Sequence, residues 1–174
     1  AAGHNTTLPF TRNVVGPMDY TPVTFSNSQH PHITSYGHEL ALSVVFESGF
    51  QHFADRPASY DSLPSEPKEF LKKVPVSWDD TKLIDGYPGE KVVIARKKEN
   101  LWYIGGLNGK DEPQTLNVKF DFPGNGKYNL QLIKDGDDGK TFTTETVTVQ
   151  RGDVIGIKCL PGGGFVGILK MQNK

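Results

Sequence analysis

From residue 76 to the end of the chain, apolar and polar side chains alternate along short segments. One segment sets Leu116, Val118 and Phe120 against polar neighbours, and a turn rich in glycine follows it at residues 124–126. Alternation with a period of two puts successive side chains on opposite faces of a half-buried strand. The pattern predicts about eight short strands, over residues 76–84, 91–96, 101–107, 116–122, 128–132, 142–149, 154–159 and 165–171. Such strands indicate an antiparallel sandwich or barrel, and we expect an antiparallel all-β sandwich.

The first part of the chain follows a different pattern. Residues 7–15 form a largely apolar run that predicts one buried strand, ended by the helix- and strand-breaking pair at residues 16–17. Residues 35–53 show the spacing of an amphipathic helix, which we expect to end at or after Gly49. Ser35 is the expected N-cap of this helix, and Glu39 lies in its first turns, where the helix dipole favours an acid.

These two patterns predict a composite chain. A strand followed by a loop and a helix is the unit of α/β folds, and a single such unit cannot bury both of its faces alone. We therefore expect residues 1–63 to be the last part of a larger α/β domain and residues 76–174 to be a β domain that folds by itself. Residues 64–75 are the expected linker, with a short helix over residues 67–73.

Charge and cysteine content narrow the classes of partner. The 174 residues carry a formal net charge of −1, so we expect neither nucleic acid nor an anionic membrane surface as a partner. The apolar runs are far shorter than the ~20 residues of a membrane helix, so no membrane span is expected, and any signal peptide would lie upstream. The single cysteine, Cys159, excludes an intramolecular disulfide.

Two polar clusters could bind a metal. The run DGDDG at residues 135–139 is similar to a calcium loop, but Gly139 stands where the EF-hand pattern needs its third ligand, which favours a hairpin turn. His30, His32 and His38 lie close in sequence, but no acid or thiol at ligand spacing completes a zinc site. Polar-loop histidines are therefore the favoured interpretation.

Two further groups could act on sugars. Glu39 and Glu47 lie a little over two helical turns apart and could form a pair of glycosidase carboxylates, although a solvated helix face is favoured. Four aromatic side chains could stack on sugar rings, but aromatic residues in β domains more often bridge the core and its rim; they are Trp78, Tyr87, Trp102 and Tyr103.

Arg12, Asp19 and Tyr20 lie within and just after the predicted strand of residues 7–15. In α/β barrels the C-terminal ends of the strands build the active site, so these residues could line or support a substrate pocket. Arg12, inside the strand, would then pair with a buried carboxylate. The alternative is that all three only brace the closure of the fold.

The chain resembles a known family in several stretches. The string HNTTLPFTRNVVGPMDYTP at residues 4–22 closely resembles the last barrel strand of family 97 glycoside hydrolases. The similarity continues in HELALSVVFES, FADRP, VSWDDT and GYPGE, at residues 38–48, 53–57, 76–81 and 86–90. It spans nearly the whole chain, and the string PFTRNVVGPMDYTP is highly specific.

This resemblance implies the C-terminal portion of an exo-acting α-glucosidase or α-galactosidase from a Bacteroides-like bacterium. The implied fold is the last βα unit of a (β/α)8 barrel, over residues 1–63, followed by the antiparallel all-β sandwich. In that family the catalytic carboxylates and calcium ligands precede the PFTR string. We therefore expect no catalytic residue, metal ligand or cofactor in this chain, and no activity from it alone.

The same resemblance implies partners for the whole enzyme. These are the N-terminal remainder of the protein, an oligosaccharide substrate and calcium, and the implied location is the periplasm. The resemblance leaves open whether glucosides or galactosides are hydrolysed, and whether the mechanism is retaining or inverting. The alternative hypothesis is a free-standing carbohydrate-binding or structural β module, which would have no use for a buried barrel strand.

Overall fold

The computed structural model of the chain describes residues 2–18, 25, 34–47 and 57–173. Two antiparallel sheets make up its larger part, one of six strands in the order β1-β2-β3-β8-β5-β6 and one formed by β4 and β7. The strands are β1 (Asp80–Tyr87), β2 (Lys91–Lys98), β3 (Leu101–Asn108), β4 (Gln114–Lys119), β5 (Lys127–Asp135), β6 (Phe142–Gln150), β7 (Val154–Cys159) and β8 (Gly164–Met171). The predicted antiparallel all-β domain is thus confirmed, although its first strand begins at Asp80 rather than at residue 76.

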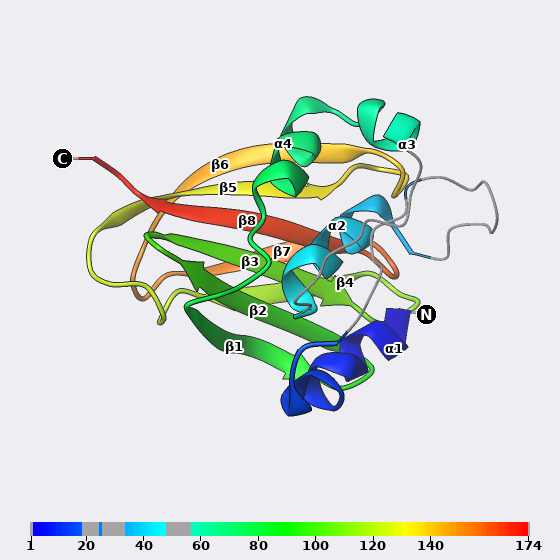
Figure 1. Cartoon of the computed structure of the whole chain (residues 1–174), viewed down its shortest axis with the longest axis horizontal. Coiled ribbons are helices and arrows are strands. Elements are labelled where there is room, and N and C mark those ends of the chain that lie inside the picture. Colours follow the sequence, from blue (N-terminus) through cyan, green and yellow to red (C-terminus); the bar gives the residue numbers. More distant parts are fainter. Residues whose placement is uncertain (1, 19–24, 26–33, 48–56, 174) are drawn as a thin grey trace.

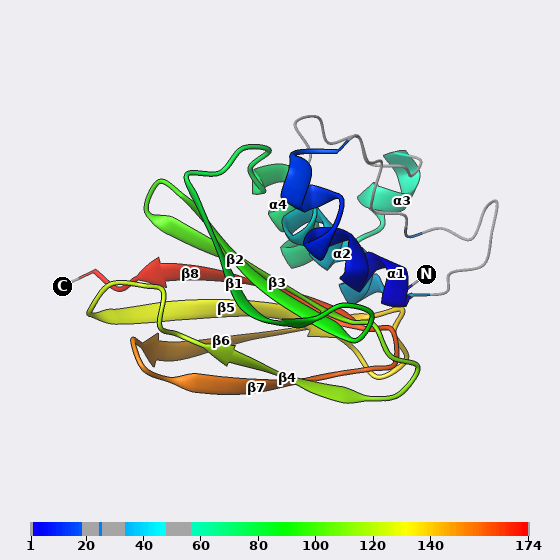
Figure 2. The same cartoon turned by 90° about the horizontal axis from the view of Figure 1, so that it is seen from below.

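Three layers are visible when the molecule is seen along the sheets (Figure 2). The six-stranded sheet lies in the middle, the β4–β7 pair covers one face, and helices cover the other. The core between the two sheets collects inward-facing residues of the alternating strands, among them Leu116, Val118, Leu130 and Leu132. The period of two in the sequence therefore corresponds to one real buried face.

A second core lies on the helix side of the same sheet. Helix α2 (Tyr36–Val45) packs on β3 and β8 and contributes Leu40, Val44 and Val45 to this core (Figure 1). Gly105 of β3 permits the close approach, because a Cβ there would lie 3.0 Å from Val44 and Val45. Since β2 and β3 are covered on both faces, their residues are apolar in unbroken runs rather than alternating.

The expected strand over residues 7–15 is wrong. The segment forms α1 (Ala2–Thr7) and two 3-10 turns, η1 (Leu8–Phe10) and η2 (Asn13–Val15). A strand needs a neighbour that pairs with its backbone groups. No described strand pairs with this segment, so its backbone bonds locally. The Thr11 N–H donates to the Leu8 carbonyl at 3.1 Å, and the Gly16 N–H to the Asn13 carbonyl at 3.3 Å. The last βα unit of a barrel is therefore not formed by the described residues.

The helix predicted over residues 35–53 is present but shorter. It begins at the predicted N-cap, where the Ser35 hydroxyl accepts the His38 N–H at 3.1 Å, and it ends at Val45 because Phe46 is extended. The other helices are α3 (Pro57–Asp61) and α4 (Ser65–Lys73), of which α4 confirms the short helix predicted within residues 64–75. None of the described helices has the length and apolar character needed to cross a membrane.

The division into residues 1–63, 64–75 and 76–174 stays a prediction, but α2 and α4 lie on the sheet rather than apart from it. Phe70 and Leu71 of α4 join the same core as α2. Residues 76–174 alone would leave this face of the sheet uncovered, exposing apolar side chains such as Val92 and Val166.

Arg96 of β2 holds the C-terminal end of α2. Its Nε donates to the Val44 carbonyl at 2.7 Å and its Nη2 to the Val45 carbonyl at 3.0 Å. These carbonyls have no partner inside the helix, because the last turn has no further N–H groups to offer. Arg96 is buried, and its positive charge lies at the negative end of the helix dipole. The interaction therefore explains both why α2 stops and how it is fixed to the sheet.

Asp135, at the end of β5, holds the opposite end of α2. Its carboxylate accepts hydrogen bonds from the Ser35 hydroxyl at 2.7 Å, the Gly37 N–H at 2.8 Å and the Gly164 N–H at 3.2 Å. Burial raises the pKa of Asp135, and these three hydrogen bonds act against that rise. A negative charge thus lies at the positive end of the helix dipole, and its hydrogen bonds connect α2 and β5 with β8.

His38 fixes α1 to the same end of α2. Its side chain is fully buried, and the Asn5 Nδ2 donates to its Nε2 at 3.0 Å. The Nδ1 therefore carries the proton and donates to the Gly163 carbonyl at 3.2 Å. Burial lowers the pKa of His38 to about 4, so the neutral ring is the form that the fold requires.

We expect Arg96→Met to lower the free energy of unfolding by about 2–5 kcal/mol, because it leaves the Val44 and Val45 carbonyls buried without donors. The matched control is Lys98→Met on the same strand, whose ammonium makes only an exposed contact with Ser77. Urea denaturation of both variants measures the difference. Equal stabilities would show that the Arg96 contacts do not hold the helix.

We expect stability to fall as the pH is lowered from about 6.5 to about 4, by up to about 3 kcal/mol from His38. Between these two pH values His38 is protonated in the unfolded chain but stays neutral in the folded chain, where burial lowers its pKa. Asp135 acts in the opposite sense, because a carboxyl with a raised pKa favours the folded state as the pH falls through that pKa.

The comparison that isolates His38 is the melting temperature against pH for His38→Gln, with His4→Gln on the exposed face of α1 as the control. His38→Gln should flatten the dependence between pH 6.5 and 4, and His4→Gln should leave it unchanged. Parallel curves for the parent chain and His38→Gln would contradict the neutral buried histidine.

Candidate functional site: the groove beside strand β1

Of the three residues predicted to border a substrate pocket, the structure describes only Arg12. Arg12 lies exposed in the turn between η1 and η2, so the expectation that it is buried in a strand is wrong. Its buried position depended on strand pairing that the segment does not have. Asp19 and Tyr20 lie outside the described residues, and their role at a pocket rim stays a prediction.

The same segment instead borders a groove of about 290 Å³ between the N-terminal turns and the first two strands. Phe10 and Val14 form one wall, and Leu83 and Ile94 form the other. Gly86 of β1 permits this packing, since a Cβ there would collide with the Phe10 ring. The groove is thus built from residues 9–14 and from strands far along the chain.

Exposed apolar side chains surround this groove. Val14 and Val15 of η2 are 74% and 83% exposed, and Leu83 of β1 is 57% exposed. Single exposed apolar residues are ordinary, but several gathered beside one groove are typical of a surface that contacts another protein segment. We call these three residues and the groove the β1 surface.

The floor of the groove is polar. Arg96 Nη1 donates to the Thr81 hydroxyl at 2.9 Å and lies 3.8 Å from Glu47 Oε2. Burial lowers the pKa of Arg96, and the charge of Glu47 opposes that change. Asn13 donates from Nδ2 to the Glu47 carbonyl at 3.2 Å, while its Oδ1 is buried with no hydrogen-bond partner among the described residues.

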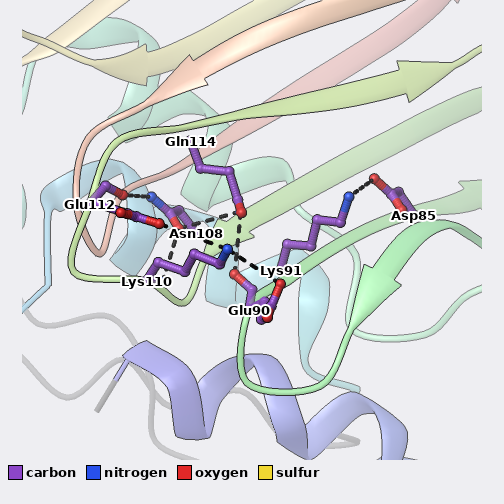
Figure 3. A network of polar contacts seen from close by, with 7 residues as sticks. All are labelled: Asp85, Glu90, Lys91, Asn108, Lys110, Glu112 and Gln114. Atoms are coloured by element: carbon purple, nitrogen blue, oxygen red, sulfur yellow. Dashed lines mark hydrogen bonds and ion pairs between the residues drawn. The ribbon is translucent and has the colours of Figure 1, made fainter.

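A second polar network lies beneath α1, at the end of β3 (Figure 3). Asn108 is fully buried, and its Nδ2 donates to the carbonyls of Glu112 and Leu160 at 2.8 and 2.9 Å. Its Oδ1 accepts the Lys110 N–H at 2.9 Å. Lys110 also lies 3.4 Å from Glu90. Because Asn108 uses both of its side-chain groups internally, the network fixes the loop after β3 and offers no ligand site.

Glu39 and Glu47 do not form a carboxylate pair, the alternative that the sequence left open. Glu39 accepts the Thr34 hydroxyl at 2.6 Å near the start of α2, whereas Glu47 lies beyond the end of the helix and beside Arg96. The expectation that both acids lie on one face of a single helix is therefore wrong, because Arg96 ends the helix at Val45.

The aromatic side chains do not form a platform either. Trp102 is buried in the core between the sheets, while Tyr103 is buried on the helix side and packs against Trp78 with ring centroids 5.4 Å apart. Tyr87 is exposed on β1. Adjacent residues of a strand point to opposite faces, so Trp102 and Tyr103 cannot stack on one sugar chain. The interpretation that these residues bridge core and rim is the one the packing supports.

The acidic run at residues 135–139 is a hairpin turn between β5 and β6, as favoured from the sequence. Asp138 accepts the Lys140 N–H at 2.9 Å and the Thr141 hydroxyl at 3.2 Å, while Asp135 is directed to α2. Among the described residues, no three His, Cys, Asp or Glu side chains are placed to hold a metal ion. The side chains seen here therefore do not fit a calcium site.

His38 is on α2 rather than in a polar loop, so the interpretation of it as a loop histidine is wrong; His30 and His32 lie outside the described residues. Arg96, Asp135 and His38 organise the fold, and none of them was predicted from the sequence to do so. Arg96 is a charge inside the apolar run of β2, which is a signal for a buried partner. Asp135 acts on residues 98 and 100 positions away, and no local pattern reveals that.

Cys159 is buried, and burial raises the pKa of its thiol to about 12. A thiol in that state is protonated at neutral pH and is a poor nucleophile. It packs in the core between the sheets with Ile157 and Leu116.

Comparison with known proteins agrees with the resemblance found in the sequence. The model of the family described as "Glycosyl-hydrolase 97 C-terminal, oligomerisation" matches residues 77–170. A probable retaining alpha-galactosidase of Streptomyces bingchenggensis is 42% identical over 168 residues, which cover 96% of this chain and 26% of that protein. A retaining alpha-galactosidase of Bacteroides thetaiotaomicron is 34% identical over 172 residues, covering 91% of this chain and 26% of that protein.

A solved structure gives the same result for the fold. A glycoside hydrolase family 97 enzyme from Pseudoalteromonas sp. strain K8, in complex with panose, superposes with a TM-score of 0.89 at 29% identity. The match covers 99% of this chain and 29% of that enzyme. The chain spans about a quarter of the length of the curated relatives it matches. On the family match over more than half of its residues, this chain belongs to the C-terminal family of the glycosyl hydrolases of family 97.

Proposed function

We propose that this chain is the C-terminal portion of an exo-acting α-glycosidase that hydrolyses α-galactosides or α-glucosides, and that it is inactive alone. The observation that carries the proposal is the 42% identity to a probable retaining alpha-galactosidase over 96% of the chain. Both curated relatives named above are called alpha-galactosidases, which favours α-galactosides and a retaining mechanism.

The proposed role of the chain is to contact and brace the remainder of that enzyme. The β1 surface supports this role, because Val14, Val15 and Leu83 leave apolar area in water beside a groove. Covering such area is favourable by about 25 cal/mol per Å².

The remainder would supply the chemistry. By the resemblance, it comprises a (β/α)8 barrel with the catalytic carboxylates, it requires calcium, and the enzyme works in the periplasm on an oligosaccharide. The described side chains of this chain offer no donor set for calcium, so its ligands would belong to the remainder.

A free-standing carbohydrate-binding or structural module is the competing function. A buried barrel strand over residues 7–15 would have argued against a free-standing module, but those residues form helical turns. Other observations must therefore separate the free-standing module from the enzyme portion. The two alpha-galactosidases match residues on both sides of the β domain boundary, over 91–96% of the chain. The separation of Trp102 and Tyr103 onto opposite faces removes the binding platform that a carbohydrate module would need.

The isolated chain should show no turnover of nitrophenyl α-galactoside or α-glucoside. General acid and base carboxylates must lie across the scissile bond, and Glu39 and Glu47 do not form such a pair. The longer protein that contains it should hydrolyse at least one of the two. Circular dichroism must show that the isolated chain is folded. Turnover by the isolated chain that is lost in Glu39→Gln or Glu47→Gln would overturn the proposal.

The same assay tests the bracing role with Val15→Asp in the longer protein. Its melting temperature and activity should fall, whereas the isolated chain should keep its stability, since Val15 is exposed there. Val154→Asp is the matched control, an exposed valine on β7 away from the groove. Equal effects of the two substitutions in the longer protein would show that the remainder of the enzyme does not contact the β1 surface.

A further inference from the structure

The six-stranded sheet has two edges, β1 and β6, and each leaves backbone groups without a strand partner. A free edge can pair with another chain, so proteins usually protect it with charges, proline, a bulge or a covering segment. The two edges of this sheet differ in that protection.

Edge β1 is protected. Its register shifts between Leu83 and Asp85, which marks a bulge, and it carries the charged residues Asp80, Lys82 and Asp85. Asp85 is paired with Lys91 at 2.8 Å, and the Phe10 ring lies against Gly86. A second strand could not add regularly along this edge.

Edge β6 has no bulge and no proline, and it carries a single charge. Its nine residues pair with β5 in an unbroken register from Phe142 to Gln150. The strand contains four threonines and two valines, no lysine, arginine or proline, and one acid, Glu145. That acid is already paired with Lys134 at 3.1 Å. Residues 143–146 are all exposed, so β6 is a long, regular and nearly uncharged edge strand.

The hydrogen-bond pattern of β5 with β8 and β6 shows which backbone groups of β6 are free. The Gln172 N–H donates to the Lys127 carbonyl, so residue 127 and every second residue after it in β5 face β8. The intervening residues of β5 face β6 and bond to residues 143, 145, 147 and 149. The N–H and C=O groups of Thr144, Thr146 and Thr148 therefore point away from the sheet.

Gln150 agrees with this alternation. Its N–H is bonded to the Asp153 carboxylate at 2.9 Å and its carbonyl accepts the Asp153 N–H, so both point away from β5. Among the described residues, no backbone hydrogen bond joins Thr144, Thr146 or Thr148 to any other segment.

We propose that β6 is the edge through which two copies of this chain pair, strand against antiparallel strand, about a two-fold axis. The proposal deepens the proposed function and rests on the family assignment. The description of the matched family includes oligomerisation but names no surface for it. A two-fold interface must be complementary to itself, and an antiparallel strand pair meets that condition. Pairing centred on Thr146 would join both six-stranded sheets into one.

The side chains of β6 suit a second copy. In that register Thr144 lies opposite Thr148, and Glu145 lies opposite Val147, so the two glutamates do not face each other. Paired threonines and β-branched residues stabilise antiparallel strands. The remainder of the enzyme has a separate surface to occupy at the other edge, where the exposed apolar residues gather around β1.

Replacing Thr146 tests this pairing. Thr146→Pro removes an outward N–H and leaves the ladder to β5 intact, as proline is tolerated on an edge strand. Thr146→Val keeps the N–H and the branched shape, and is its matched control. Thr146→Lys adds a charge at the centre of the edge, with Thr115→Lys on the exposed face of β4 as its control. Sedimentation equilibrium of the 174-residue chain and of the longer protein measures the dissociation constant.

We expect a dimer for the parent chain, Thr146→Val and Thr115→Lys. Thr146→Pro should weaken it by at least about tenfold, since a two-fold axis removes two hydrogen bonds for one substitution, and Thr146→Lys should also weaken it. Circular dichroism checks that each variant is folded. If Thr146→Pro fails to fold, the dissociation constant of Thr146→Lys tests the pairing through β6. An unchanged dissociation constant in folded Thr146→Lys overturns the proposal, as does a parent chain that stays monomeric.

Two other outcomes are distinct. A longer protein that is monomeric yet hydrolyses an α-galactoside would overturn the pairing and leave the proposed function standing. A fall in activity or melting temperature of the longer protein by Thr146→Lys, with its dissociation constant unchanged, would assign β6 to the remainder of the enzyme and overturn pairing between copies.

Discussion

Helix α2 is held at both of its ends by charged side chains of the sheet that it covers. Asp135 receives three hydrogen bonds at the N-terminal end, and Arg96 donates to the last carbonyls at the C-terminal end. Each charge has the sign that the helix dipole favours, and each satisfies backbone groups that the helix leaves open. The remaining structure on this side of the sheet depends on that placement.

The consequences extend from α2 in both directions. At its start, His38 joins α1 and the turn before β8, and at its end Glu47 and Asn13 form the polar floor of the groove beside β1. Burying such groups is costly unless each has a partner, so they specify one arrangement of helices on the sheet. With both faces of the sheet covered, its two edges are left for contacts with other protein: the groove at one, the regular strand β6 at the other.

The strands could be predicted from the sequence because one face of each is buried and the period of two survives in residues such as Leu116 and Val118. The segment at residues 7–15 could not, since a short apolar run fits a strand or a helix equally well and only its neighbours decide. The end of α2 was also missed, because the residue that ends it, Arg96, lies about fifty positions away.

The candidate site was predictable only in part. The family could be recognised from residues 4–22, but the groove could not, because its walls come from residues near 10, 47 and 81–96 that meet only in the fold. Arg12 was expected in a buried strand, but it lies exposed. The buried arginine is Arg96, and its position within an apolar run of the sequence is the signal that could have predicted its burial.

Native-state hydrogen exchange of the α2 amides tests the central claim most directly. If Asp135 and Arg96 clamp the helix to the sheet, the amides of residues 40–45 should open only with the β3 and β8 amides, at the same free energy. Protection of residues 40–45 that is lost well before that of β3 and β8 would show that the helix detaches by itself, and would contradict the account.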